Sequence, residues 1–301
     1  MRVRLLHTLC VLLVMWTPCA FGALSILATV PEWGALATEI GGDRVSVYVA
    51  TTAMQDPHHV EARPSLIARA RGADLVVATG AELEAGWLPL VTQQAGNVRI
   101  QPGKPGYFEA AARVTLVDKP VKLDRAGGDV HAAGDPHIQT DPRNIAPVAA
   151  GLAARLAELD PANAAFYQER QRVFDERWRT AMSRWEREAA PLRGVAVVAH
   201  HKGFTYLERW LGLEEVATLE PVPGVEPTAA HLSRVLATIE RRSVKMVIRA
   251  TYQSDRASQW IAERTNIRAV ALPATVGGTP AAKNLFAFYD DLIERLLAAV
   301  Q

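Results

Sequence analysis

Cysteine is nearly absent from this chain of 301 residues. The only two, Cys10 and Cys19, lie at its beginning. We interpret this beginning as a secretory signal peptide over residues 1–23, because Arg2 and Arg4 precede a short apolar run that is followed by small residues. Its cleavage would leave a protein without disulfides and without thiolate ligands for a metal.

Two other interpretations of the N-terminus remain. The apolar run is shorter than the ~20 residues that span a bilayer, which argues against a membrane anchor. A lipid anchor on Cys19 is disfavoured, because Pro18 is a poor neighbour for lipoprotein processing. We therefore expect a secreted protein; the family resemblance described below implies that its location is the periplasm.

An excess of charge of either sign is also missing. The 33 Lys and Arg residues nearly balance the 32 Asp and Glu residues, for a formal net charge of +1. Nucleic-acid binding requires a basic face, so this composition argues against it. Hydrophobic residues make up 49% of the chain and charged residues 22%. That balance excludes a disordered chain, and the length allows two domains with proper cores.

The motifs of common enzyme classes are missing as well. The sequence contains no His-Glu-x-x-His motif, no Gly-x-Ser-x-Gly elbow and no glycine-rich phosphate loop. Glu61, Glu220 and Glu226 lie near predicted loops, but none has a spacing that marks a catalytic base. We therefore expect a protein that is not an enzyme.

The sequence does contain a regular alternation of strand and helix patterns. The expected strands lie at 24–30, 45–50, 74–79, 98–100, 195–199, 216–219, 244–250 and 268–272. The expected helices lie at 32–40, 64–71, 82–93, 144–159, 161–190, 203–211, 228–241, 255–265 and 281–300. Such alternation predicts an α/β fold whose mostly parallel sheets are flanked by helices.

The alternation divides the chain into two lobes of similar size. An N-terminal α/β lobe is expected over 24–142 and a C-terminal α/β lobe over 191–301, while 143–190 is expected to be a linker of two consecutive helical segments. The second helical segment, of about 30 residues, would extend ~45 Å at 1.5 Å per residue. That length is too great for a local helix of a small domain, so we predict a long, rigid linker helix between the lobes.

Three histidines lie in short motifs that are far apart in the sequence. They are His58 in Asp56-Pro57-His58, His137 in Asp135-Pro136-His137 and His201 in His200-His201-Lys202. Proline stiffens the first two loops, and open parallel sheets bind ligands at the carboxyl ends of their strands. Three imidazoles that meet in a cleft between the lobes would form a zinc-like site. The aspartates would either cap turns, which we favour, or accept an imidazole N–H.

Each histidine must be weighed against the fact that a lone histidine is more often structural than a ligand. His131 is either an auxiliary metal ligand or a solvated side chain, and Glu226 is a candidate for a fourth ligand. His59 and His200 adjoin better candidates, and His231, inside an expected helix, is expected to be structural.

The three motifs together resemble those of the zinc- and manganese-binding periplasmic proteins of ABC importers, the group with a rigid helical linker. Residues 56–65 read Asp-Pro-His-His-Val-Glu-Ala-Arg-Pro-Ser, residues 134–142 read Gly-Asp-Pro-His-Ile-Gln-Thr-Asp-Pro, and residues 201–213 begin His-Lys-Gly-Phe-Thr-Tyr-Leu and end Leu-Gly-Leu. The resemblance extends over nearly all of the chain from residue 24 onward.

The resemblance implies a two-lobed solute-binding protein, expected to be a monomer, that delivers a divalent metal ion to an ABC permease in the inner membrane. It also implies His58, His137 and His201 as ligands of the transported ion. The carboxylate that the family often supplies from its second lobe has no counterpart at 249–252 or 271–274. Three nitrogen ligands favour Zn²⁺, with Mn²⁺ or another divalent metal as the alternative.

Two other functions are compatible with three histidines. A zinc-dependent hydrolase would use the same ligands with a bound water, but it would need a nearby base. A metal-stabilised surface adhesin would hold zinc for folding, so removal of the metal would damage its fold.

Overall fold

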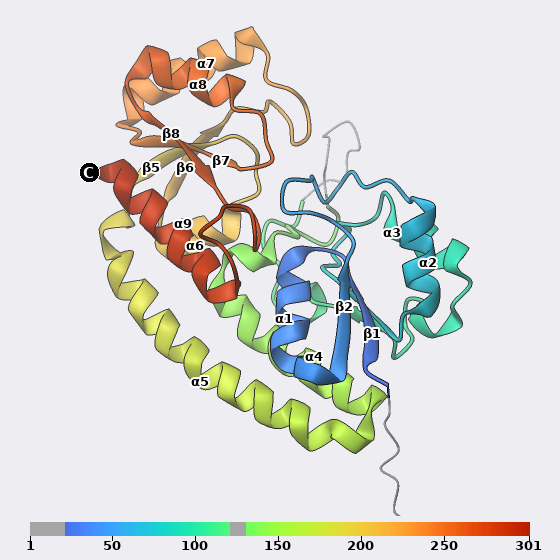
Figure 1. The fold of residues 1–301 in the computed structure, drawn as a ribbon. Coiled ribbons are helices and arrows are strands. Elements are labelled where there is room, and N and C mark those ends of the chain that lie inside the picture. The colour runs from blue at the N-terminus through green and yellow to red at the C-terminus, as the bar shows by residue number, and fades with distance from the viewer. Residues whose placement is uncertain (1–21, 121–130) are drawn as a thin grey trace, which may run out of the picture.

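The protein has two lobes, each built on a four-stranded sheet, and a long helix runs past both of them (Figure 1). This architecture is that of a computed structural model, which describes residues 22–120 and 131–301. The predicted signal peptide, apart from its last residues, and both cysteines lie outside the described residues.

Both sheets are parallel and share one strand order. The N-terminal sheet runs in the order β2 (Val45–Val49), β1 (Leu24–Ala28), β3 (Leu75–Ala78), β4 (Tyr107–Glu109). The C-terminal sheet runs in the order β6 (Glu214–Thr218), β5 (Ala196–Ala199), β7 (Met246–Ala250), β8 (Arg268–Leu272). The lobes therefore repeat one topology, and the predicted fold class is confirmed.

Most of the helices lie within a few residues of their predicted positions. They are α1 (Pro31–Gly41), α2 (Pro64–Gly72), α3 (Leu88–Ala95), α4 (Ile145–Leu159), α5 (Ala164–Glu188), α6 (Thr205–Leu211), α7 (Ala229–Arg242), α8 (Arg256–Thr265) and α9 (Leu285–Val300). Proline occupies the first turn of α1, α2 and α3, where a missing N–H breaks no helical hydrogen bond. No helix in the described ranges combines the length and the apolar character needed to cross a membrane.

Two predicted elements of the N-terminal lobe are wrong. The helix expected at 82–93 begins only at Leu88, because Ala81 and Glu82 have positive φ angles of 49° and 69°. The buried carboxylate of Glu84 holds this turn by accepting the backbone N–H groups of Thr79 and Gly80. A helix at these residues would break the two hydrogen bonds of the Glu84 carboxylate.

The strand expected at 98–100 is a turn of 3-10 helix, Val98–Ile100. The side chain of Asn97 caps this turn by accepting the N–H of Arg99 and also donates to the carbonyl of Ala73. The place beside β3 belongs instead to β4, a three-residue strand that was not predicted.

The strands bury both of their faces, which is typical of parallel sheets covered by helices. In β1, Ile26 and Ala28 point into a cluster that continues through α4, α5 and α9 into the second lobe, whereas Leu27 packs under α2 and α3. In β5, Val197 belongs to the same shared cluster and Val198 to a separate one under α7 and α8. One continuous hydrophobic core therefore spans both lobes.

Helix α5 supplies the aromatic part of the shared core. Trp178 lies 5.1 Å from Phe174 and 5.2 Å from Trp185, measured between ring centroids, and 4.9 Å from Phe286 of α9. Its indole N–H donates to the carbonyl of Pro142 at 2.9 Å. Since these rings fix α5 to both lobes, the linker can allow only small relative motion.

A buried polar contact also joins the lobes. The hydroxyl of Thr275, which follows β8, donates to the carboxylate of Glu32 at the start of α1. Burial of Glu32 raises its pKa to about 7, although the Thr275 hydrogen bond opposes the shift. The folded protein therefore favours the protonated carboxyl, and its ionisation costs stability as the pH rises.

This shift predicts a loss of stability toward alkaline pH. Stability from a raised carboxyl pKa is fully present below the unfolded value and is lost as the pH rises through the folded value, here between about 4.5 and 7. Between pH 5 and pH 8, the unfolding free energy of the native protein should therefore fall by about 2–3 kcal/mol more than that of the Glu32→Gln variant, which has no carboxyl group to ionise. Urea denaturation at both pH values measures the difference. Glu39→Gln, on the partly exposed side of α1, is the control, and equal pH dependence in all three proteins would refute the prediction.

Candidate metal centre

Three loops bring His58, His137 and His201 together between the lobes. His58 lies in the connection after β2, His137 directly before the short 3-10 turn Ile138–Thr140, and His201 directly after β5. Their ring centroids are separated by 5.4 Å (His58 to His137), 6.1 Å (His58 to His201) and 5.7 Å (His137 to His201). Each ring is less than a tenth exposed. The three candidates therefore meet as the sequence predicted.

The two Asp-Pro-His motifs have the same local geometry. Asp56 Oδ1 accepts the backbone N–H of His58 at 2.9 Å and contacts its Nδ1 at 2.8 Å. Asp135 Oδ1 does the same for His137, with both distances at 2.8 Å. Each aspartate therefore closes a turn and orients an imidazole with one oxygen, so the two roles considered from the sequence occur together.

These contacts shift the pKa values of both aspartates in the same direction. Burial by itself would raise the pKa of Asp56, but the hydrogen bond and charge of His58 outweigh it and hold that pKa at about 2. The pKa of Asp135 is likewise lowered, because His137 outweighs the effect of burial. Both carboxylates are ionised at neutral pH and are suited to accept an N–H from the imidazole.

The third histidine has a carboxylate partner that sequence reasoning missed. Glu220 Oε2 lies 2.7 Å from His201 Nδ1 and accepts the backbone N–H of Gly224 at 2.8 Å. The sequence marked Glu220 only as an acidic residue near a loop, since 19 positions separate it from His201. A signal was available, because Glu220 follows β6 and His201 follows β5, and these two strands are neighbours in the sheet.

A carboxylate at Nδ1 leaves Nε2 as the ring nitrogen that could bind a metal ion. The Nε2 atoms of His58 and His137 are buried, and among the described residues neither has a hydrogen-bond partner. A buried nitrogen without a partner is costly unless something binds it. The donor set, imidazole nitrogen supported by carboxylates, fits a borderline-soft divalent ion.

Glycine at position 203 lets the third loop approach both neighbouring rings. A Cβ atom built there would lie 3.1 Å from Cδ2 of His201 and 3.7 Å from Nε2 of His137. Any side chain larger than hydrogen would therefore push against His201. Glycine at this position thus leaves room for both rings.

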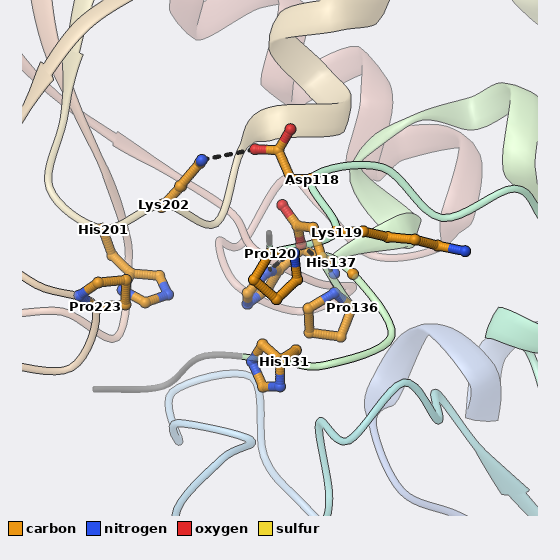
Figure 2. A pocket seen from close by; sticks show the side chains of 11 residues that line it. Asp118, Lys119, Pro120, His131, Pro136, His137, His201, Lys202 and Pro223 are labelled. Carbon is orange, nitrogen blue, oxygen red and sulfur yellow. Dashed lines mark hydrogen bonds and ion pairs between the residues drawn. The ribbon is translucent and has the colours of Figure 1, made fainter. Parts of the chain in front are cut away.

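His131 forms a fourth wall of the site. Its ring stacks on His58 with the centroids 5.3 Å apart and the planes at 29°. Burial, together with the nearby His58 and His137, lowers the pKa of His131 to about 4. Figure 2 shows His131, His137 and His201 around one cavity, which has a volume of about 490 Å³. Glu226, the other fourth-ligand candidate, is exposed and is not among the residues described as lining this cavity.

The arrangement is somewhat wider than a closed coordination sphere. Within the described residues, no three His, Cys, Asp or Glu side chains already stand close enough to hold an ion. Rings that share a tetrahedral zinc ion have centroids roughly 5 Å apart, a little less than the separations found here. Binding would therefore draw the rings inward by a fraction of an ångström to about 1 Å.

Comparisons with known proteins agree with this fold. The sequence profile of a family described as "Zinc-uptake complex component A periplasmic" matches residues 26–299. The high-affinity zinc uptake system protein ZnuA of Paracoccus denitrificans is 23% identical over 299 residues, covering 85% of this chain and 86% of that protein. The manganese ABC transporter substrate-binding lipoprotein PsaA of Streptococcus anginosus is 22% identical over 250 residues, covering 81% and 77%. A crystal structure of ZnuA superimposes with a TM-score of 0.76 at 25% identity, covering 91% and 99%.

The paired carboxylates predict how the site responds to mutation. Asp135→Asn should weaken zinc binding by roughly 10- to 100-fold, because the amide supports the Nδ1–H of His137 less strongly. Isothermal titration with a competing chelator measures this change. Asp141→Asn is the matched control, since Asp141 closes the same kind of turn on the N–H of Arg143 but orients no imidazole. Equal zinc affinity in the Asp135 variant and the native protein would contradict the assignment.

Proposed function

Because the chain belongs to the family of the periplasmic zinc-uptake component A proteins, the substrate-binding components of metal ABC importers, we propose that it captures zinc between its lobes and delivers it to a membrane permease. His58, His137 and His201 are the proposed ligands of the transported ion. The observation that carries this proposal is the meeting of three imidazoles, each with a carboxylate at Nδ1, in one buried site.

The choice of zinc rests on the chemistry of the donors. The carboxylates of Asp56, Asp135 and Glu220 contact the Nδ1 atoms of the three rings. The donors proposed to face the ion are therefore imidazole nitrogens. Imidazole suits zinc, whereas manganese favours carboxylate, carbonyl and water oxygens. Relatives named for zinc and for manganese both match this chain, so the donor set is the basis for preferring zinc.

We assign the fourth coordination position to His131. It stacks on His58 at the wall of the site, and its lowered pKa keeps the imidazole neutral at the pH at which metals bind. The exposed Glu226 is the weaker candidate. A fourth nitrogen would complete a tetrahedral set and would further favour zinc over manganese.

The proposed route of the ion follows from the two lobes. The proposed site would lie between the lobes at 24–142 and 191–301, which 143–190 would link. The two lobes would move only slightly relative to each other, because one hydrophobic core spans both of them. A signal peptide over 1–23 would place the protein in the periplasm, where as a monomer it would meet the permease in the inner membrane. The neutral overall charge agrees with a partner other than nucleic acid.

The hydrolase and adhesin alternatives receive less support. A hydrolase needs a base free to take a proton, but Asp56, Asp135 and Glu220 are all held by imidazole N–H groups. A zinc-dependent adhesin fold would need the metal to hold its lobes together. Here the lobes already share a continuous apolar core, so the metal-free protein should remain folded.

Metal titration tests the function directly. Purified protein should bind one zinc ion and should bind it more tightly than manganese. His58→Ala, His137→Ala and His201→Ala should each lose most of that affinity, while His231→Ala, in α7, should keep it. Three variants with native zinc affinity would disprove the ligand assignment. Thermal melting of the metal-free protein, which should remain cooperative, separates transport from a structural role.

The affinity should also depend on pH in a defined direction. Zinc binds neutral imidazole, so affinity should fall as the pH drops through the ordinary histidine range near 6.5. Burial lowers the pKa of His137 and of His131, so these two rings stay neutral to lower pH. Part of the loss of zinc affinity should therefore occur only below the ordinary histidine range. Zinc titrations at several pH values from 5 to 7.5 measure this profile, and a flat profile would count against a histidine site.

A further inference from the structure

Tyr206 lies in a position that none of the ligand motifs explains. Its side chain is 3% exposed, on the first turn of α6, close in sequence to His201. The hydroxyl donates to the carbonyl of Asp135 at 2.9 Å and accepts the backbone N–H of Val117 at 3.2 Å. One hydroxyl thus connects the helix that follows His201 to two backbone segments on the other side of the site.

Three polar groups of Asp135, the residue that orients His137, are engaged in hydrogen bonds. Its N–H donates to the carbonyl of Val117 at 2.9 Å, its own carbonyl accepts from Tyr206, and its Oδ1 orients the His137 ring. Tyr206 therefore bonds to both members of the Val117–Asp135 pair. A shift of Asp135 would therefore tilt the imidazole that it orients.

Besides Tyr206, a second contact joins the segment that carries His201 to the segment before His137, but it is more exposed. Lys202 also reaches across, with its Nζ 2.7 Å from Asp118 Oδ2 (Figure 2). However, the Lys202 side chain is 47% exposed, and exposed ion pairs contribute little. The buried hydroxyl of Tyr206 is shielded from water, so the loss of its hydrogen bonds would leave a backbone N–H and a carbonyl without their partner.

We propose that Tyr206 is a positioning residue for metal capture, because its hydroxyl fixes the segment that carries His137 relative to the segment that carries His201. The two imidazoles then stand at nearly their binding separation before the ion arrives, which lowers the cost of ordering them on binding. This inference rests on the proposed zinc site but concerns a residue that does not touch the ion.

The test is the Tyr206→Phe variant, which removes only the hydroxyl. Zinc affinity, measured by chelator competition, should fall about tenfold, at the lower end of the range for groups that support metal ligands. The loss should lie mainly in faster zinc dissociation, which stopped-flow chelation measures. The absorption spectrum of bound Co²⁺ should also change, since it reports the ligand geometry. A purely structural role would lower the unfolding free energy and leave that spectrum unchanged.

Two comparisons make the result specific. Tyr167→Phe is the matched control, because this buried tyrosine of α5 also loses a hydroxyl hydrogen bond, to Asp160 at 2.8 Å, without contact to the site. In the Asp135→Asn background, Tyr206→Phe should cause a much smaller further loss, because the two residues act on the same ring. Native zinc affinity and dissociation in Tyr206→Phe, or fully additive losses, would overturn the inference while leaving the zinc site intact. An inability of the native protein to bind zinc would instead reject the proposed function.

Discussion

The constraint on which this structure depends is the contact between a carboxylate and the Nδ1 atom of each site imidazole. Asp56, Asp135 and Glu220 make that contact at 2.7–2.8 Å. Each contact fixes the tautomer and the plane of its ring, so the Nε2 atoms of His58 and His137 are buried without another partner. Burial of these two nitrogens without a partner is costly, and a bound cation, as proposed, would remove that cost.

The scaffold around the site resists wide opening. The aromatic side chains of α5 and the buried contact between Glu32 and Thr275 join both lobes, and the shared apolar cluster is continuous from β1 to α9. A wide hinge motion would expose this core to water at a large cost. Capture and release must therefore work through small displacements of the loops that carry the histidines. Their ring separations, slightly wider than in a closed zinc complex, are consistent with such a small closure.

Much of this arrangement was predictable from the sequence, and the exceptions have physical causes. Strand-helix alternation predicted the fold class correctly. The two Asp-Pro-His motifs predicted which of their histidines lie close together, because each motif is local in the chain. Glu220 was missed because its pairing with His201 depends on the adjacency of β5 and β6, which spacing does not reveal. The helix expected at 82–93 starts late because the buried Glu84 holds a non-helical turn. The stacking of His131 on His58 is likewise a tertiary contact with no local signal.

The same carboxylates that orient the rings also bear on the release of the ion. Three carboxyl groups lie directly behind the imidazoles, so together they would attract a divalent cation and strengthen the basicity of the proposed ligands. Such a site binds well but gives up its ion slowly unless the geometry changes. Because His58 and His131 belong to one lobe and His201 to the other, separating the lobes by about 1 Å would stretch the proposed metal–nitrogen bonds, about 2 Å long for zinc, beyond binding range. In the proposed site, a partner that holds both lobes could therefore release the ion with a displacement small enough to preserve the shared core.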